Sequence, residues 1–242
     1  GAAEQAHDII KKYPKAFMAW NILGMACKGL GKTDGATEAF RKVAELNPGY
    51  ADGFSNLGVA LEDEGKLEEA TEAYKQAVAL NPEHAQAYCN MGNVLSERGE
   101  LSEALEAYTK AIKIKPDYAL AFNNLGVTLK EQGQMDEAIE ACRNAILVNP
   151  DYAEAHNNIG LIFKDQGKLE DAIEAYNKAL SIQPDYPDVY VNMGLALQEQ
   201  SKSEEAIEAY KKVISINPDY AEAYYNMGNL LQDQGKLEDA IE

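Results

Sequence analysis

Histidine, cysteine and carboxylate side chains are the groups through which this chain could perform catalytic or metal chemistry. Its histidines, His7, His84 and His156, lie far apart in unlike sequence surroundings, so they predict neither a metal cluster nor a base beside a nucleophile. His156 is expected to fill an aromatic slot in the core. Adjacent carboxylates such as Glu68 and Glu69 recur where a solvated helix face is expected. We therefore predict no enzymatic activity, no catalytic residues, no metal site and no cofactor.

The cysteines are three in number and widely spaced, which gives neither a disulfide framework nor a CxxC metal pair. This pattern favours a reducing intracellular compartment, most simply the cytoplasm. Cys27 and Cys142 are expected in the core, and Cys89 is the candidate for an exposed thiol. The apolar runs are only a few residues long, so no insertion into a membrane is expected.

Asparagine is the polar residue that recurs with the most regular spacing. It is a mediocre helix former, so its repeated presence within helix-like segments requires a cause. One cause is structural, a side-chain hydrogen bond that joins adjacent helices. The other is functional, a ladder of amides that binds the backbone of an extended peptide. Both explanations stay open for the six residues Asn56, Asn90, Asn124, Asn158, Asn192 and Asn226.

A repeat of 34 residues positions these asparagines. A proline recurs at this period from Pro14 to Pro218, and a glycine recurs from Gly24 to Gly228. We number each unit so that this glycine is position 8, which places the asparagine at position 6. Repeats of this length stack without closing into separate globules. We therefore predict one solenoid over residues 1–242, with a partial unit at 1–16, full units at 17–50, 51–84, 85–118, 119–152, 153–186 and 187–220, and a partial unit at 221–242.

Each unit is predicted to form two helices, here called helix A and helix B. In the unit 153–186, a capping box of Asp151 and Glu154 is expected to begin helix A. Gly167 is expected to end helix A about thirteen residues on, because glycine readily takes the left-handed conformation. Helix B is expected over residues 169–183, before Pro184.

The same terminating glycine recurs in the other units, Gly235 included, and Ser201 is the exception expected to loosen its turn. Apolar residues at positions 4, 7 and 11 of helix A and 20, 24 and 27 of helix B form two stripes that must be buried. The glycine at position 8 is expected to face the alanine at position 20, as Gly160 would face Ala172. Small residues on both helices would let the two backbones approach closely.

The order of residues within a unit resembles the tetratricopeptide repeat family. The first full unit carries the pattern in the run WNILG at residues 20–24, followed by Ala36, Phe40 and Pro48. The resemblance implies an all-α fold, a right-handed superhelical solenoid of antiparallel helix pairs. It also implies that one face of the A helices lines a concave groove in which a protein or peptide segment binds.

The asparagine ladder is further similar to that of the repeat regions of O-linked N-acetylglucosamine transferases, where concave asparagines hold peptide substrates. Only the repeat region is similar, so the resemblance implies no transferase activity. The subgroup that binds a carboxyl terminus through lysines and asparagines matches poorly, because position 5 is here Asn, Ser, Cys, Val or Tyr and never Lys.

Positions 9 and 13 are expected to flank the ladder within the groove. Position 9 is mostly aliphatic with two polar breaks, and position 13 is acidic, which suggests an apolar strip and an acidic border. Solvation alone is the favoured explanation of the acids. If they bind a ligand, the ligand should carry Lys or Arg. The candidate residues are Val127, Leu161, Leu195, Asn93 and Asn229 at position 9, and Asp63, Glu97, Glu131, Asp165 and Glu199 at position 13.

The chain has 40 acidic and 22 basic residues, a formal net charge of −18. Such a surface repels phosphate backbones, so nucleic acid is not expected as a partner, and helical repeats that read RNA are disfavoured. Neutral or basic proteins and peptides are the favoured partners.

Three functions remain open at this point. The leading one is a protein–protein interaction scaffold, part of a longer protein, that binds an extended or helical peptide in its concave groove. The first alternative is a self-assembling array that forms homo-oligomers by stacking through uncapped ends, because the sequence begins and ends within a helix B. The second is the substrate-recruiting arm of a glycosyltransferase-like enzyme whose catalytic domain lies outside these residues.

Overall fold

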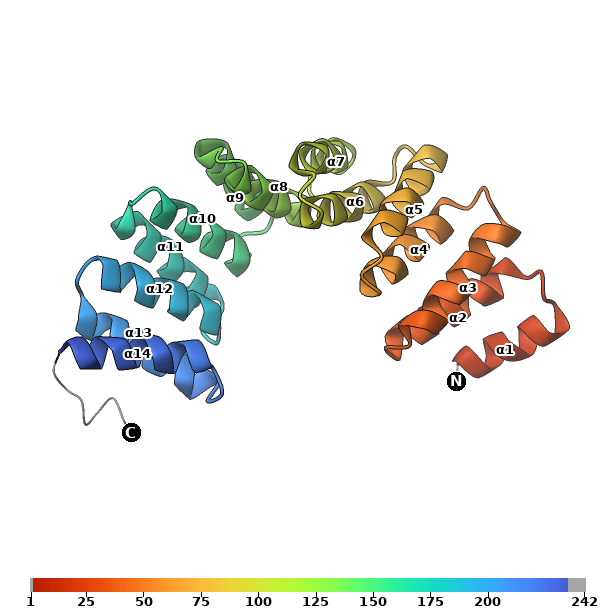
Figure 1. Ribbon diagram of the computed structural model, residues 1–242. Coiled ribbons are helices and arrows are strands. Elements are labelled where there is room, and N and C mark those ends of the chain that lie inside the picture. The colour runs from red at the N-terminus through yellow and green to blue at the C-terminus, as the bar shows by residue number, and fades with distance from the viewer. Residues whose placement is uncertain (1, 235–242) are drawn as a thin grey trace. The chain divides into compact units, whose positions relative to one another are not determined.

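A computed structural model describes residues 2–234 of the chain. These residues form fourteen helices joined by short turns, and the chain divides into two compact units, Gly1–Asn124 and Leu125–Glu242. The predicted all-α fold of antiparallel helix pairs is confirmed in both (Figure 1).

The first unit begins with a helix B and continues with three A–B pairs (Figure 1). Helix α8 (Ala119–Glu131) lies on the boundary, with residues 119–124 in the first unit and 125–131 in the second. The other helices of the first unit are α1 (Ala2–Lys12), α2 (Phe17–Gly29), α3 (Thr33–Leu46), α4 (Ala51–Asp63), α5 (Leu67–Leu80), α6 (Ala85–Glu97) and α7 (Leu101–Ile114).

The second unit continues the same alternation of A and B helices and ends, within the described residues, on a helix A. Its helices after α8 are α9 (Met135–Val148), α10 (Ala153–Asp165), α11 (Leu169–Ile182), α12 (Pro187–Glu199), α13 (Ser203–Ile216) and α14 (Ala221–Asp233). The expected range of helix B in the unit 153–186 is thus right to within one residue, because α11 ends at Ile182.

The expected capping box at the start of α10 is wrong. The helix begins at Ala153, so Tyr152 and not Asp151 is its N-cap residue, and no side chain caps it. Asp151 instead belongs to the preceding turn, where its backbone N–H donates to Asn149 Oδ1 at 3.3 Å. The carboxylate lies one residue too early to reach the first free N–H groups of the helix.

The turn between helices A and B requires a left-handed residue. Gly167 takes a φ of +72° there, and Ser201 takes +60° at the equivalent place. Ser201 also keeps the bonds of the turn, since its N–H donates to Gln198 O at 2.9 Å as Gly167 N–H donates to Lys164 O at 2.8 Å. The expectation of a loosened turn is therefore wrong. Ser201 keeps the geometry of the turn, although its left-handed backbone conformation is disfavoured for residues that carry a Cβ. Gly235 lies outside the described residues.

In five repeats the nearest neighbour of the glycine at position 8 is an aromatic ring, and not the expected alanine. A Cβ added to Gly58 or Gly194 would lie 2.6 Å from the Cε1 atom of Tyr74 or Tyr210, at position 24 of helix B. Gly126 differs, because a Cβ there would meet the Sγ atom of Cys142 at 2.5 Å and the backbone O atom of Ala138, the expected alanine, at 3.0 Å. Close packing is thus the reason for the glycine, and in the other five repeats the edge of a ring fills the space.

The core of each unit consists of these rings and the small residues around them. In the first unit, Ala70, Tyr74 and Ala77 are fully buried, and in the second unit Ala206, Tyr210 and Val213 are fully buried. These are positions 20, 24 and 27. The predicted burial of this stripe of helix B is therefore confirmed. No helix within residues 2–234 is both long and apolar enough to span a membrane.

The thiols are distributed differently from the expectation. Cys89 is fully buried, while Cys27 is partly exposed, so the prediction of an exposed Cys89 is wrong. Burial raises the pKa of the Cys89 thiol to about 11, and burial followed by the Glu154 charge raises that of Cys142 to about 12. Neither thiol is a nucleophile at neutral pH, because the thiolate is the reactive form.

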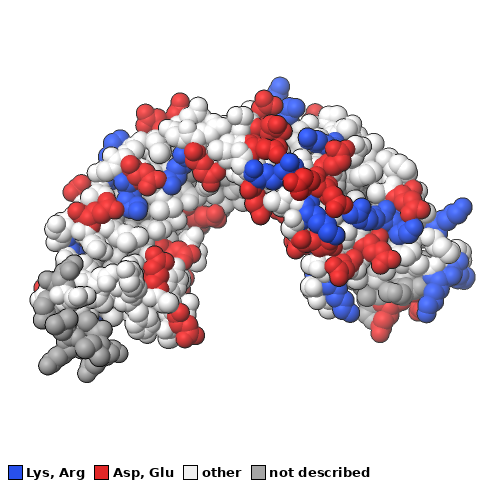
Figure 2. Space-filling model, viewed as in Figure 1, with Lys and Arg blue, Asp and Glu red and all other residues white. Residues whose placement is uncertain are grey.

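Acidic and basic side chains are interspersed over the visible face of the first unit (Figure 2). Among the described pairs, Arg41 and Glu69 join α3 to α5 at 2.6 Å. Both side chains are about half exposed, and an exposed pair of this kind contributes only about 0–1 kcal/mol to stability. The surface charge therefore bears on solubility and partners more than on the fold.

Candidate functional site

The six asparagines at position 6 lie on the equivalent face of their A helices, three in each compact unit, and we call this row in either compact unit the asparagine face. They come from α4, α6, α8, α10, α12 and α14, and each is partly buried. A half-buried amide in the middle of a helix must satisfy part of its hydrogen bonding within the protein and can offer the rest outward.

Two of these asparagines join neighbouring A helices directly. Asn56 Nδ2 donates to Asn21 Oδ1 at 3.1 Å, and Asn192 Nδ2 donates to Asn157 Oδ1 at 3.1 Å. The acceptors Asn21 and Asn157 are both 7% exposed. They occupy position 5 of the preceding 34-residue repeat. The same two positions therefore form the same bond in both compact units. The structural explanation of the ladder therefore holds at these two places.

Where position 5 is not asparagine, the partner changes. The repeat before that of Asn124 carries Cys89 at position 5. The Asn124 Nδ2 atom donates instead to Asn93 Oδ1 at 2.8 Å. The same Asn93 oxygen accepts the Tyr108 hydroxyl at 2.9 Å. Asn93 was expected as a polar break within an apolar strip; it is also a hub that holds α6, α7 and α8 together.

Asn90 and Asn226 show the two other outcomes. Asn90 Oδ1 accepts from Gln86 Nε2 on its own helix at 2.8 Å. The repeat before that of Asn226 carries Val191 at position 5, which offers no acceptor. The Asn226 Nδ2 atom is buried with no hydrogen-bond partner among the described residues. The missing acceptor accounts for this orphan donor. Asn158 is partly buried like the others.

The inter-helix bond leaves part of each amide available. Asn56 and Asn192 each use one N–H on the neighbouring helix, and no other described residue bonds their Oδ1 atom or second N–H. The bond also fixes the orientation of the amide, so a carbonyl oxygen and an N–H point away from the paired helix in a defined direction. A peptide backbone carries the complementary donor and acceptor.

The aliphatic residues expected at position 9 are partly exposed beside the asparagines. Val127, Leu161 and Leu195 are each half-buried, and Asn229 is exposed. Met25, at the same position of the first full unit, is 60% exposed. The asparagine face is therefore an amide row with apolar side chains next to it.

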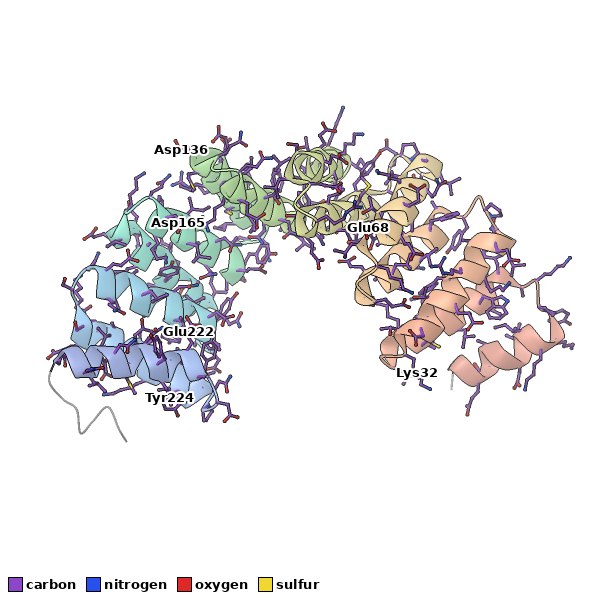
Figure 3. All side chains as sticks on the ribbon, in the orientation of Figure 1. Lys32, Glu68, Asp136, Asp165, Glu222 and Tyr224 are labelled. Carbon is purple, nitrogen blue, oxygen red and sulfur yellow. The ribbon has the colours of Figure 1, made fainter. Side chains whose placement is uncertain are left out.

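The acidic side chains at position 13, Asp63, Glu97, Glu131, Asp165 and Glu199, are all exposed. Two of them are paired with a lysine of the preceding A helix: Lys28 Nζ lies 2.6 Å from Asp63 Oδ2, and Lys130 Nζ lies 2.8 Å from Asp165 Oδ2. Asp165 stands at the C-terminal end of α10 (Figure 3). Glu97, Glu131 and Glu199 have no ion pair with a described residue.

Three features of the asparagine face were not predicted from the sequence. Asn21 and Asn157 act as acceptors, and the asparagines at position 5 were the signal for them. Lysine at position 12 neutralises part of the border. Glu62, also at position 12, accepts the Tyr74 hydroxyl at 2.9 Å. Burial raises the pKa of the Glu62 carboxyl, the Tyr74 bond lowers it, and the charges of Asp63 and Glu97 raise it again.

No group of three or more His, Cys, Asp or Glu side chains within the described residues is arranged to hold a metal ion. Two cavities of the second unit lie elsewhere, each lined by two successive B helices and the A helix between them. His156, expected in the core, is only partly buried and lines one of them. Tyr190, at the same position one repeat later, is also partly buried and lines the corresponding cavity, so position 4 lies at the edge of the core.

Comparison with known proteins identifies the repeat. Residues 51–242 match the family model of the cilia and flagella-associated protein 70 C-terminal domain, a tetratricopeptide repeat domain, and residues 19–50 match the model of the tetratricopeptide repeat itself. A search of curated proteins found no match.

Solved structures of similar fold include Cut9 in the APC/C hetero-tetramer Cut9–Hcn1, with 21% identity and a TM-score of 0.76 over 93% of this chain. This chain spans 45% of that protein's length, and the likeness shows the fold alone. MamA is 30% identical, with a TM-score of 0.62 over 67% of this chain and 95% of MamA. YrrB, described as having an unusual peptide-binding site, is 28% identical, with a TM-score of 0.59 over 78% of this chain and 98% of YrrB. The family models, the repeated helix pairs and these structures agree that the chain belongs to the tetratricopeptide repeat family.

Proposed function

We propose that the chain is an interaction scaffold whose asparagine face binds an extended peptide along its backbone. The observation that carries the proposal is the geometry of Asn56 and Asn192. Each amide is fixed by one bond to the neighbouring helix and keeps an acceptor and a donor for a ligand. A fixed amide loses little freedom on binding, which favours affinity.

The comparisons support the general class. The solved relatives include a protein described by its peptide-binding site and a subunit of a hetero-tetramer. Stacked repeats present extended surfaces that such partners use. One amide contact contributes only about 0.5–1.5 kcal/mol, so a useful affinity requires several neighbouring repeats to contact the same peptide.

The exposed acids favour a basic ligand. Asp63 and Asp165 are already paired with lysines, so Glu97, Glu131 and Glu199 are the acids with charge left for a partner. Lys or Arg side chains of a bound peptide would lie at this border. Such contacts weaken as ionic strength rises, because salt screens exposed charges.

A reducing compartment such as the cytoplasm belongs to the same proposal. The three cysteines are free thiols, and burial of Cys89 and Cys142 keeps them from forming disulfides without unfolding.

Selection of peptides from a random library displayed on phage, with the intact chain as bait, tests the proposal. We expect a peptide bound to either compact unit to lose about two- to tenfold in affinity for the double variant Asn56→Ala with Asn192→Ala, which removes one fixed amide from each unit. The matched control is Asn177→Ala, which removes the same amide from an exposed position of the B helix α11. Equal loss in the control and the double variant, or no loss in either, would place the binding site away from the asparagine face.

A further inference from the structure

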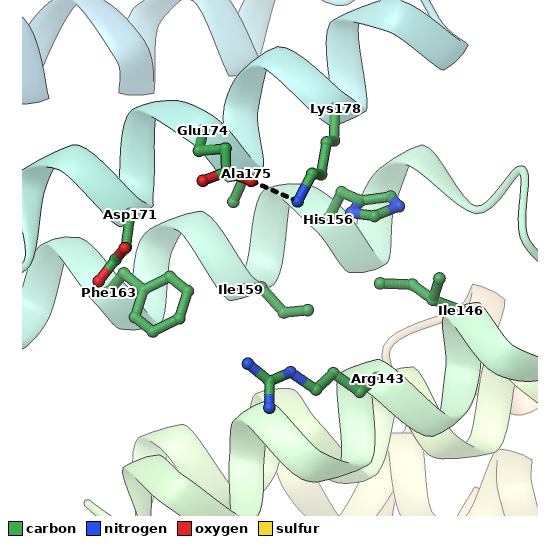
Figure 4. A pocket seen from close by; sticks show the side chains of 9 residues that line it. All are labelled: Arg143, Ile146, His156, Ile159, Phe163, Asp171, Glu174, Ala175 and Lys178. Atoms are coloured by element: carbon green, nitrogen blue, oxygen red, sulfur yellow. Dashed lines mark hydrogen bonds and ion pairs between the residues drawn. The ribbon is translucent and has the colours of Figure 1, made fainter.

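A second site lies on a different side of the helices from the asparagine face. It is a cavity of about 340 Å³ between α9, α10 and α11, all within the second unit. Arg143 reaches it from α9, His156 from α10, and Lys178 from α11 (Figure 4). Positions 4, 7 and 11 of α10 line this cavity, whereas positions 6, 9 and 13 of the same helix form the asparagine face.

The basic groups of the cavity differ in how they are paired. Lys178 Nζ lies 2.6 Å from Glu174 Oε1, an exposed pair one helical turn apart. Such a pair contributes little to stability, so the ammonium group can turn to a ligand at small cost. Arg143 is exposed and bonds no other described residue, so its guanidinium group is available as a fork of N–H donors.

The floor of the cavity is apolar. Ile159 is buried, and Ile146 and Phe163 are partly buried beside it, so their side chains present hydrocarbon to the open space. In Figure 4 the Arg143 side chain extends along this floor, between Ile146 and Phe163. A volume of this size is at the lower end of the range for ligand pockets and is sufficient for one or two side chains.

The next repeat supplies an internal comparison. A cavity of about 340 Å³ recurs there, and eight of its nine lining residues are those of the α9–α11 cavity shifted by 34. Asn177 then replaces Arg143, Tyr190 replaces His156, and Lys212 replaces Lys178. The cavity is therefore a feature of the fold, but the convergence of Arg, His and Lys belongs to the α9–α11 cavity and is absent one repeat later.

We propose that the α9–α11 cavity binds a peptide segment of a partner that presents a carboxylate side chain next to an aliphatic one. The carboxylate would accept a forked pair of bonds from Arg143, with Lys178 as a second cation. The aliphatic side chain would cover Ile159 and Phe163. This site goes beyond the asparagine face, and it selects a ligand of opposite charge to the basic peptide proposed there.

His156 gives the site a pH signature. Burial lowers the pKa of His156, and the Lys178 charge lowers it further. The charged groups facing the imidazole are Arg143 on α9 and Lys178 and Glu174 on α11, with Asp171 further along α11. A bound carboxylate adds a negative charge beside the ring and raises its pKa, so binding takes up a proton and tightens as the pH falls towards the free pKa of His156.

Nuclear magnetic resonance titration of the intact chain tests the site with two blocked dipeptides as probes, acetyl-Glu-Leu-amide and acetyl-Gln-Leu-amide. They differ only in charge. We expect the Glu probe to shift the amide signals of α9, α10 and α11 around the cavity and to bind about tenfold more tightly than the Gln probe. We also expect it to raise the pKa of the His156 ring. Equal binding of the two probes, or an unchanged His156 titration, would overturn the proposal.

Two matched variants complete the test. Arg143→Asn introduces the residue that the chain itself carries at Asn177, and Lys211→Asn removes a cation from the equivalent position one repeat further on. We expect about tenfold weaker binding of the Glu probe to Arg143→Asn and unchanged binding to Lys211→Asn. Equal effects of the two variants would mean that only the overall charge matters, which contradicts a built site. Asn56→Ala with Asn192→Ala should leave this binding unchanged, so failure of either proposal is distinguishable from failure of the other.

Discussion

Asn192 Nδ2 on α12 donates a hydrogen bond to Asn157 Oδ1 on α10 across 3.1 Å. The bond joins two A helices that are separated in sequence by a whole helix B, and Asn56 and Asn21 form the same bond in the first unit. It accounts for the asparagine at these two places, where the amide joins one repeat to the next. It also holds that amide in a fixed orientation.

The first prediction concerns the acceptor of this bond. Asn157→Val should lower the free energy of unfolding by about 1–3 kcal/mol, because it leaves a half-buried Asn192 donor without a partner. Valine is the residue that the chain itself carries at this position, as Val191. Denaturant unfolding followed by circular dichroism measures the loss.

A double-mutant cycle provides the control for this change. Asn157→Val with Asn192→Val removes both partners and should recover part of the stability, because no buried polar group is then orphaned. Losses that simply add in the double variant would show that the two amides do not interact.

The second prediction concerns one substitution at two equivalent positions. Asn226→Leu should raise stability by about 1 kcal/mol, because it removes a buried donor that has no partner among residues 2–234. Asn192→Leu should lower stability, because it leaves Asn157 Oδ1 unsatisfied. Thermal unfolding of the two variants measures the expected gain of stability in one and the expected loss in the other. Shifts of the same sign would contradict the assignment of Asn226 as the orphan member of the ladder.

The third prediction concerns the glycine at position 8. Gly194→Ala should lower the free energy of unfolding by about 1–3 kcal/mol, since the new Cβ would lie 2.6 Å from the Tyr210 ring and force a shift in a fully packed core. Gly29→Ala is the matched control: Gly29 is also helical, but its Cβ would meet nothing within 4 Å. It should be neutral or stabilising by up to about 1 kcal/mol. Equal effects would mean that helix propensity, and not the ring, sets the requirement.

The fourth prediction concerns Glu62 and pH. Burial raises the pKa of this carboxyl in the folded protein, so the folded state binds the proton more tightly than the unfolded state. The stability that this proton contributes is present below the ordinary glutamate pKa and is lost as the pH rises through the folded pKa. Glu62→Gln keeps an acceptor for the Tyr74 hydroxyl without the buried charge. Its stability relative to the wild type should therefore increase across that pH window.

Glu103→Gln, an exposed change of the same charge on α7, is the control for the loss of one negative charge. Stability curves measured from pH 4 to pH 8 compare the variants. A constant difference between Glu62→Gln and the wild type over this range would contradict the raised pKa.

The period of 34 residues was sufficient to predict the helix pairs, the buried stripe of helix B and the family. It could not predict which residue lies nearest a position-8 glycine, because that depends on the rotation of helix B about its axis. In α13 this rotation brings the ring of Tyr210 against Gly194. The capping box failed for a related reason. The pattern Asp151 to Glu154 has the right spacing, but the helix begins one residue later than that spacing requires.

The candidate site was predictable in outline only. The asparagine row is visible in the sequence, but its bonds depend on position 5 of the previous repeat, which varies between Asn21, Cys89, Asn157 and Val191. The acidic border is likewise visible, but its neutralisation by Lys28 and Lys130 requires knowledge of how successive A helices align.

The central claim is that the asparagine face binds a peptide through its backbone, and N-methylation of a bound peptide tests it most directly. A peptide selected on the intact chain is methylated at one backbone nitrogen at a time, and each product is compared with the peptide whose side chain at that residue is replaced by alanine. Because successive N–H groups of an extended chain point in opposite directions, we predict that alternate methylations each weaken binding about two- to tenfold while most side-chain replacements do not. Methylated peptides that all bind as tightly as their parent, with binding lost on side-chain replacement instead, would contradict the account.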